Sequence, residues 1–126
     1  MKFKAICENH LYSKAYSKGK RALTSALALY VLPDYQAKRL AKAHPGKIMM
    51  NRIGITVSIK LGGAVVRSRV RRIIRAALQS LQKERALRVG FLIVICARGA
   101  AVKLKSTDIK LQLNTAFEKL GLYKEI

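Results

Sequence analysis

The sequence predicts an α+β fold, in which helices pack against a mixed sheet. Residues 21–32 and 53–60 alternate in character at every second position, and residues 91–97 form an unbroken apolar run. Residues 9–18, 61–81 and 106–120 have the apolar spacing or the end signals of helices. A period of two residues is typical of strands, and a period of 3.6 residues is typical of helices. The pattern therefore gives the element order α-β-β-α-β-α.

The first two expected strands each have a core face and a face of small residues. In the stretch 21–32, the core face consists of Leu23, Leu27, Leu29 and Val31. In the stretch 53–60, it consists of Ile53, Ile55, Val57 and Ile59. The second faces carry small or hydroxyl side chains and Tyr30, which predicts an open groove on that side of the sheet. The run 91–97 suits a strand that is buried on both faces at the centre of the sheet.

The stretch 61–81 predicts a helix with one apolar face and one cationic face. Its apolar residues fall on one arc at 100° per residue: Val66, Val70, Ile73, Ile74, Ala77, Leu78 and Leu81. Arg67, Arg71 and Arg75 recur every four residues beside this arc, and Arg69 and Arg72 continue the charge around the helix. No acidic residue occurs between Asp34 and Glu84. Like charges at this spacing repel each other, and guanidinium groups match phosphate oxygens, so we expect a polyanion to bind here.

The overall charge supports the same class of partner. The 126 residues contain 26 Lys and Arg but only 6 Asp and Glu, which gives a formal net charge of +20. Such a balance is typical of proteins that bind nucleic acid. The longest apolar run is far shorter than the roughly 20 residues that a membrane-spanning helix needs. We therefore expect residues 1–126 to form a single nucleic-acid-binding domain, cytoplasmic and without contact to a membrane, with Cys7 and Cys96 reduced.

The sequence offers no pattern for a catalytic site of its own. The six acidic residues are scattered, and none of them pairs at a spacing that suits acid–base work or metal binding. His10 and His44 stand alone, without the partners that a zinc site requires. Residues 33–51 carry both prolines and are expected to form a surface loop, with one helical turn near 37–43.

The segment GITVSIKLGGAVVRSRVRRIIRAAL, residues 54–78, closely resembles the signature of the bacterial ribonuclease P protein component. The N-terminal stretch HLYSKAYSKGKRALTSALALYVL resembles the first helix and the following strand of the same family. Together the resemblance covers most of residues 9–123. Two positions depart from the family pattern. Ser68 replaces the usual Asn and is shorter, and Ile59 replaces a usual Lys and removes one charge.

The resemblance implies a four-stranded mixed sheet in an α/β sandwich. The implied element order is α-β-β-β-α-β-α, with one short strand more than the pattern resolves. It also implies a left-handed β-α-β crossover from the strand at 53–60, against the usual right-handed rule.

The resemblance also implies a function. Members of this family are protein cofactors of an endonuclease that removes the 5′ leader from precursor tRNA, while the RNA subunit and its magnesium ions perform the hydrolysis. No cofactor is then expected on the protein alone, and the protein is expected to be monomeric. By resemblance, the residues that bind the catalytic RNA are Lys60, Arg67, Ser68, Arg69, Arg71, Arg72 and Arg75. The leader would bind at Tyr12, Tyr16 and Tyr30, which suits the stacking of unpaired bases on aromatic rings.

Two other classes share the strong positive charge. A structural RNA-binding protein of the ribosome would have a similar charge and a similar sandwich. A DNA-binding protein of the nucleoid would share the charge, but the sequence has no evident dimerisation element or minor-groove arm.

Overall fold

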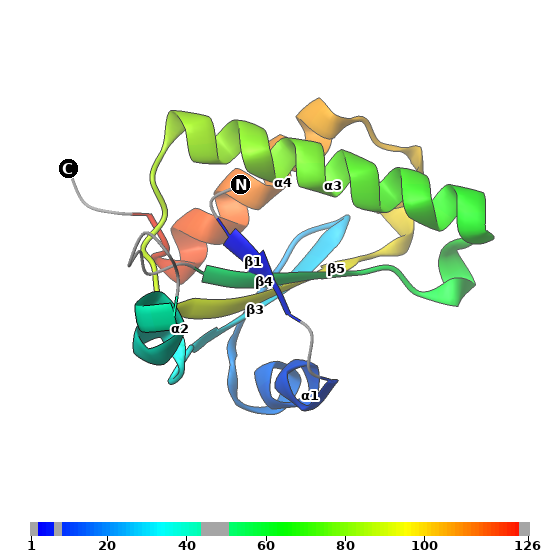
Figure 1. Cartoon of the computed structure of the whole chain (residues 1–126). Coiled ribbons are helices and arrows are strands. Elements are labelled where there is room, and N and C mark those ends of the chain that lie inside the picture. Colours follow the sequence, from blue (N-terminus) through cyan, green and yellow to red (C-terminus); the bar gives the residue numbers. More distant parts are fainter. Residues whose placement is uncertain (1–2, 7–8, 44–50, 124–126) are drawn as a thin grey trace.

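The computed structural model describes residues 3–6, 9–43 and 51–123, and it places a five-stranded sheet between helices (Figure 1). Helices α3 and α4 cover one face of the sheet, and α1 lies on the other. The helices are α1 (Asn9–Lys18), α2 (Ala37–Ala43), α3 (Ala64–Glu84) and α4 (Ser106–Leu120). The strands are β1 (Phe3–Ala5), β2 (Lys20–Leu23), β3 (Leu27–Pro33), β4 (Asn51–Thr56) and β5 (Phe91–Ala97). The α+β class and the sandwich of helices on a sheet are confirmed.

The sheet is mixed, with the strand order β1-β4-β5-β3-β2. Strand β5 is central: it pairs parallel to β4 and antiparallel to β3. The parallel pair β4–β5, joined through α3, confirms the β-α-β unit, whereas its left-handedness stays a prediction. Four of the strands make up the expected sheet. The fifth, β1, pairs parallel to β4 and was not predicted, because three residues are too few to carry a period.

The expected strand 21–32 is in fact a hairpin of β2 and β3, which supplies the additional short strand. The chain reverses at Thr24, whose backbone N–H donates a 2.8 Å hydrogen bond to the carbonyl of Leu27. Because the reversal changes the alternation, Ala22 is buried and Leu23 is 46% exposed, opposite to the expectation. The side chain of Gln112 on α4 holds this turn, accepting hydrogen bonds from the Thr24 hydroxyl (2.6 Å) and the Ala26 N–H (2.9 Å).

The expected strand 53–60 ends early, at Thr56. Ile53 and Val57 are buried as predicted, but Ile59 is 77% exposed, so its assignment to the core was wrong. Residues Ile59–Leu61 form a short 3-10 turn, η1. The hydroxyl of Ser58 accepts a hydrogen bond from the Lys60 N–H (3.2 Å), which satisfies a backbone donor outside the sheet and favours the turn over a longer strand.

Two apolar layers hold the fold together. The larger layer lies between the sheet and helices α3 and α4, and the predicted stripe of α3 faces it, with Val66 and Ile73 partly buried at its margin. The smaller layer lies beneath α1 and consists of Ile6, Leu11, Ala15, Leu32, Leu92 and Val94. Strand β5 contributes to both layers, Ile93 and Ile95 to the first and Leu92 and Val94 to the second. Its burial on both faces is confirmed.

A buried ion pair fastens the end of β3 to β4. The guanidinium of Arg52 donates two hydrogen bonds to the carboxylate of Asp34, at 2.7 and 2.9 Å, and both side chains are at least nine-tenths buried. The Asp34 N–H donates to the carbonyl of Gly90 (2.8 Å), and the Asp34 carboxylate also accepts from the Gln36 N–H (3.1 Å). The chain is therefore fixed at the point where it leaves β3. The expected helical turn near 37–43 is confirmed as α2, and residues 44–50 of the same loop lie outside the described residues.

Candidate RNA-binding surfaces

Helix α3 begins at a glycine turn that only a residue without a side chain fits well. Gly62 has a φ of +151°, and a Cβ at this position would lie 2.9 Å from Cβ of Val66. Its N–H donates to the carbonyl of Ile59 (3.2 Å) and closes η1. The turn sets the direction of α3 and places Lys60 immediately before the arginines. We call the seven residues on this turn and helix the arginine surface: Lys60, Arg67, Ser68, Arg69, Arg71, Arg72 and Arg75.

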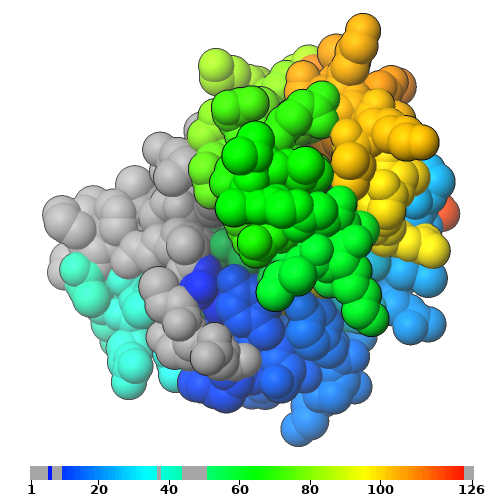
Figure 2. Space-filling view, turned by 90° about the vertical axis from the view of Figure 1, so that its right-hand side faces the viewer, coloured from blue at the N-terminus to red at the C-terminus, as the bar shows by residue number. Residues whose placement is uncertain are grey.

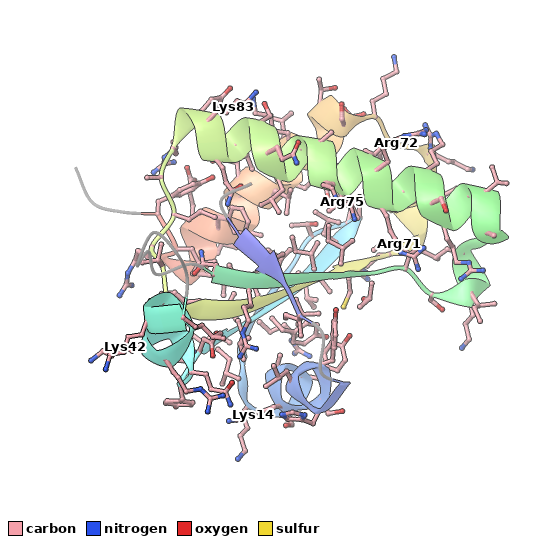
Figure 3. All side chains as sticks on the ribbon, viewed as in Figure 1. Lys14, Lys42, Arg71, Arg72, Arg75 and Lys83 are labelled. Carbon is pink, nitrogen blue, oxygen red and sulfur yellow. The ribbon has the colours of Figure 1, made fainter. Side chains whose placement is uncertain are left out.

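The arginine surface occupies two flanks of α3. Figure 3 shows Arg71 and Arg75 projecting from the flank nearer the sheet and Arg72 projecting from the opposite flank. Arg67 lies one helical turn before Arg71, so helical spacing places it on the first flank. Lys60, Ser68, Arg69, Arg72 and Arg75 are exposed, and Arg67 and Arg71 are half-buried. The structure therefore brings the predicted residues onto one continuous helix and the turn before it.

The carboxylates in the described part of the chain are engaged elsewhere. Asp34 pairs with Arg52, Glu84 with Lys110 and Glu118 with Arg85. The carboxylate of Asp108 accepts the N–H of Lys105 at the start of α4. No ion pair within residues 3–6, 9–43 and 51–123 involves an arginine of α3. Their charges therefore stay available for phosphate groups.

Two of the arginines differ from simple exposed cations. The Nε of Arg67 is buried and has no hydrogen-bond partner among the described residues. The guanidinium of Arg69 donates a 3.0 Å hydrogen bond to the carbonyl of Val102, in the 3-10 turn Gly99–Lys103. Arg69 therefore also ties this turn to α3, a structural role that the sequence did not predict.

Three tyrosines gather on the face of the sheet that carries α1, and we call them the tyrosine cluster: Tyr12, Tyr16 and Tyr30. Tyr16 and Tyr30 meet edge to face, with ring centroids 5.0 Å apart and an interplanar angle of 82°. The ring of Tyr12 lies over Gly54 of β4, so closely that a Cβ at Gly54 would overlap it. Tyr16 is 45% exposed, whereas Tyr12 and Tyr30 are half-buried against the apolar layer beneath α1. Tyr16 thus offers the most accessible ring, and Tyr12 also supports the fold.

Sequence reasoning missed two polar neighbours of Tyr16. Its hydroxyl lies 3.6 Å from Sγ of Cys96, where either group is able to donate the hydrogen bond. Thr56, the register partner of Cys96 across β4 and β5, also lies near Tyr16. Burial, followed by the contact with Cys96, raises the pKa of Tyr16 to about 12, although Thr56 acts to lower it. The predicted small-residue face of the strand 53–60 already included Thr56. Cys96 was not predicted as a polar neighbour, because it lies within the apolar run 91–97. Cys96 is a free thiol, and Cys7 lies outside the described residues.

The raised pKa predicts a difference between wild type and Tyr16→Phe at high pH. The pKa of Tyr16 is about 12 in the folded protein, whereas an unperturbed tyrosine has a pKa of 10.0. As the pH rises, Tyr16 therefore loses its proton first in the unfolded chain. The stability that neutral Tyr16 contributes is complete below pH 10 and is lost as the pH rises toward 12. Thermal unfolding of both proteins across this range should show a steeper loss for wild type. The loss is expected to be modest because the ring is partly exposed, and parallel curves would contradict the assignment.

The two surfaces share one side of the molecule. Figure 2 shows the first part of α3, in green, and α1, in blue, on the same face. A single partner, or two partners held together, is therefore able to contact both. Among the described residues, no group of three or more His, Cys, Asp or Glu side chains is placed to hold a metal ion. No helix in the described ranges has the length and apolar character needed to cross a membrane.

Comparison with known proteins finds relatives that are ribonuclease P protein components. The chain is 36% identical over 122 residues to the ribonuclease P protein component of Clostridium acetobutylicum, a match that covers 97% of this chain and 92% of the relative. It is 32% identical over 118 residues to the ribonuclease P protein component of Bacillus velezensis, covering 94% and 90% of the two chains. The fold is similar to that of the Staphylococcus aureus RNase P protein, with a TM-score of 0.74, 22% identity and coverage of 95% and 97% of the two chains.

The family model described as ribonuclease P matches residues 1–121. This range contains the arginine surface, the glycine turn before it and all three residues of the tyrosine cluster. The fold, the extent of the match and the named relatives agree: the chain belongs to the ribonuclease P protein family.

Proposed function

We propose that this chain acts as the protein subunit of a ribonuclease P holoenzyme through two separate RNA surfaces. The arginine surface binds the catalytic RNA, and the tyrosine cluster binds the 5′ leader of precursor tRNA. The observation that carries the first assignment is the set of arginines on α3 that no described carboxylate pairs with. Such a set is stabilised by phosphate groups, which release counterions when they are bound.

The tyrosine cluster suits an unpaired strand rather than a duplex. The exposed ring of Tyr16 offers a flat surface, and its edge-to-face contact with Tyr30 holds it in place before a base arrives. Thr56 and Cys96 supply small polar groups at the floor of the same site. Stacking on aromatic rings tolerates any base, as leaders of different sequence require.

Catalysis in this proposal belongs to the RNA subunit with its magnesium ions. The protein positions the substrate and assists removal of the leader, which leaves the mature 5′ end of the tRNA. We further propose that residues 1–126 work as one RNA-binding domain, as a monomer and in the cytoplasm. The family match gives this role precedence over the ribosomal alternative.

The tyrosine cluster is tested by replacing Tyr16 or Tyr30 with Ala in the holoenzyme. Loss of a stacking surface is worth ~1–3 kcal/mol per base, or about 5- to 150-fold in affinity. Affinity for precursor tRNA should be measured with leaders of about one and about eight nucleotides. We expect the advantage of the long leader to shrink, while affinity for the catalytic RNA stays at the wild-type level.

Tyr16→Phe is the matched control, because it keeps the ring and its contact with Tyr30 and should retain the long-leader advantage. Each Ala variant must also unfold near the wild-type temperature, since Tyr30 packs against the layer beneath α1. Equal weakening with both leaders would assign these tyrosines to the core or to the docking of catalytic RNA instead.

A further inference from the structure

A fourth tyrosine, Tyr35, is the most exposed of the tyrosines whose exposure the structure gives. It is 77% exposed, compared with 45% for Tyr16. It lies in the turn between β3 and α2, which the sequence predicted only as a surface loop. Because its ring is largely outside the apolar layers, packing of the core does not explain a large aromatic residue here.

The turn that carries Tyr35 is held rigidly. Asp34, the residue before it, is locked by the buried pair with Arg52 and by its N–H bond to Gly90. The N–H of Gln36, the residue after it, donates to the same carboxylate. Tyr35 is therefore presented to solvent from a backbone that is fixed on both sides. When a ligand stacks on this ring, the side chain has to be ordered, but the backbone does not.

The surroundings of Tyr35 are cationic. The ammonium group of Lys14 on α1 lies 5.1 Å from the centroid of the Tyr35 ring, in cation–π range. Lys38 and Arg39 on α2 are exposed, and neither forms an ion pair with a described carboxylate. Neither α1 nor α2 contains an acidic residue. We call Lys14, Tyr35, Lys38 and Arg39 the Tyr35 surface, and Figure 3 shows Lys14 and Lys42 projecting outward on this side of the molecule.

The Tyr35 surface and the tyrosine cluster lie on two flanks of α1. Tyr12 and Tyr16 are four residues apart and face the sheet, whereas Lys14 falls about 200° around the helix from each of them. The exposed residues of α1 between the two flanks are His10, Ser13 and Ser17, and Lys18 lies on the far side of Lys14. Among the described residues, a single strand that leaves Tyr16 therefore crosses α1 without meeting a carboxylate before it reaches Tyr35.

We propose that the Tyr35 surface binds the distal part of the 5′ leader, upstream of the nucleotides held by the tyrosine cluster. This inference rests on the proposed function, because it extends the path of the same strand. A base stacks on the exposed Tyr35 ring, and Lys38 and Arg39 contact the neighbouring phosphates. A single ring among cations suits a nucleic acid strand better than a protein partner, which would need a contiguous apolar patch.

The experiment uses the holoenzyme and precursor tRNA with leaders of about one, four and twelve nucleotides. For wild type, affinity should rise at each step of leader length. Tyr35→Ala should remove the gain from the second step, about 5- to 30-fold, and keep the gain from the first. Tyr16→Ala should show the reverse pattern. Tyr35→Phe retains the ring and should behave as wild type, and Leu111→Ala, at a 68% exposed site on α4, is the matched control for loss of an exposed side chain.

The outcomes separate this inference from the proposed function. If the Tyr35→Ala variant binds the twelve-nucleotide leader with wild-type affinity, this overturns the inference and leaves the proposed function intact. So does weaker binding of this variant to catalytic RNA without tRNA, which would assign the Tyr35 surface to that partner. If wild-type protein neither binds the catalytic RNA nor responds to leader length, the proposed function fails, and the inference fails with it.

Discussion

Replacing Arg67 and Arg71 together with Ala is expected to weaken binding to the catalytic RNA by about 10- to 100-fold at low salt. Each phosphate contact contributes roughly 0.7 to 0.9 to the slope of log affinity against log salt concentration. Two lost contacts should therefore lower the slope by about 1.4 to 1.8 units.

The fold should survive this double change. Ala is the best helix former, and removal of two like charges at i and i+4 relieves repulsion on α3. Titration of binding against salt gives the slope directly. Lys119→Ala, which removes an exposed cation from α4, is the matched control and should leave the slope unchanged. An unchanged slope in the double variant would mean that Arg67 and Arg71 are only solvated.

Replacing Asp34 with Ala is expected to lower the free energy of unfolding by about 3–5 kcal/mol. The guanidinium of Arg52 is more than nine-tenths buried and would lose a bidentate partner, which is the costly way to break an ion pair. The same change removes the acceptor of the Gln36 N–H at the turn before α2. Chemical denaturation of wild type and variant measures the difference.

The companion variants separate the cost of leaving a buried charge without its partner from the cost of removing a side chain. Asp34→Leu combined with Arg52→Met removes both charges and should recover a large part of the loss. Glu84→Ala breaks the exposed pair with Lys110 and should cost only about 0–1 kcal/mol. If Asp34→Ala were as mild as Glu84→Ala, the pair would not anchor the end of β3.

The elements that could be predicted are those whose pattern is local and long. The stripe of α3 repeats over about four turns, and β5 is apolar throughout, so both were predicted close to their observed bounds. The hairpin at Thr24 was missed because its turn is held by Gln112, which lies 88 residues away in sequence. The predicted period of two was carried on through this reversal, so it placed Ala22 and Leu23 on the wrong faces.

The candidate site shows the same division. The charge pattern located the arginines of α3, and the family resemblance located the three tyrosines, but neither distinguishes a ligand contact from a structural one. The bond from Arg69 to Val102 and the packing of Tyr12 on Gly54 are long-range contacts, which only the fold creates. Ile59 was assigned to the core because its position fits the period of β4, but the strand ends three residues earlier. The roles of these residues in RNA binding stay predictions.

Reconstitution of leader cleavage tests the central claim most directly. Purified protein is added to a ribonuclease P catalytic RNA and precursor tRNA at low magnesium, where the RNA alone is expected to work poorly. The account predicts that the protein raises the rate of cleavage at the junction between leader and tRNA, and that protein with magnesium but without the catalytic RNA leaves the substrate intact. No rise in rate, or specific cleavage at that junction by the protein alone, would contradict it.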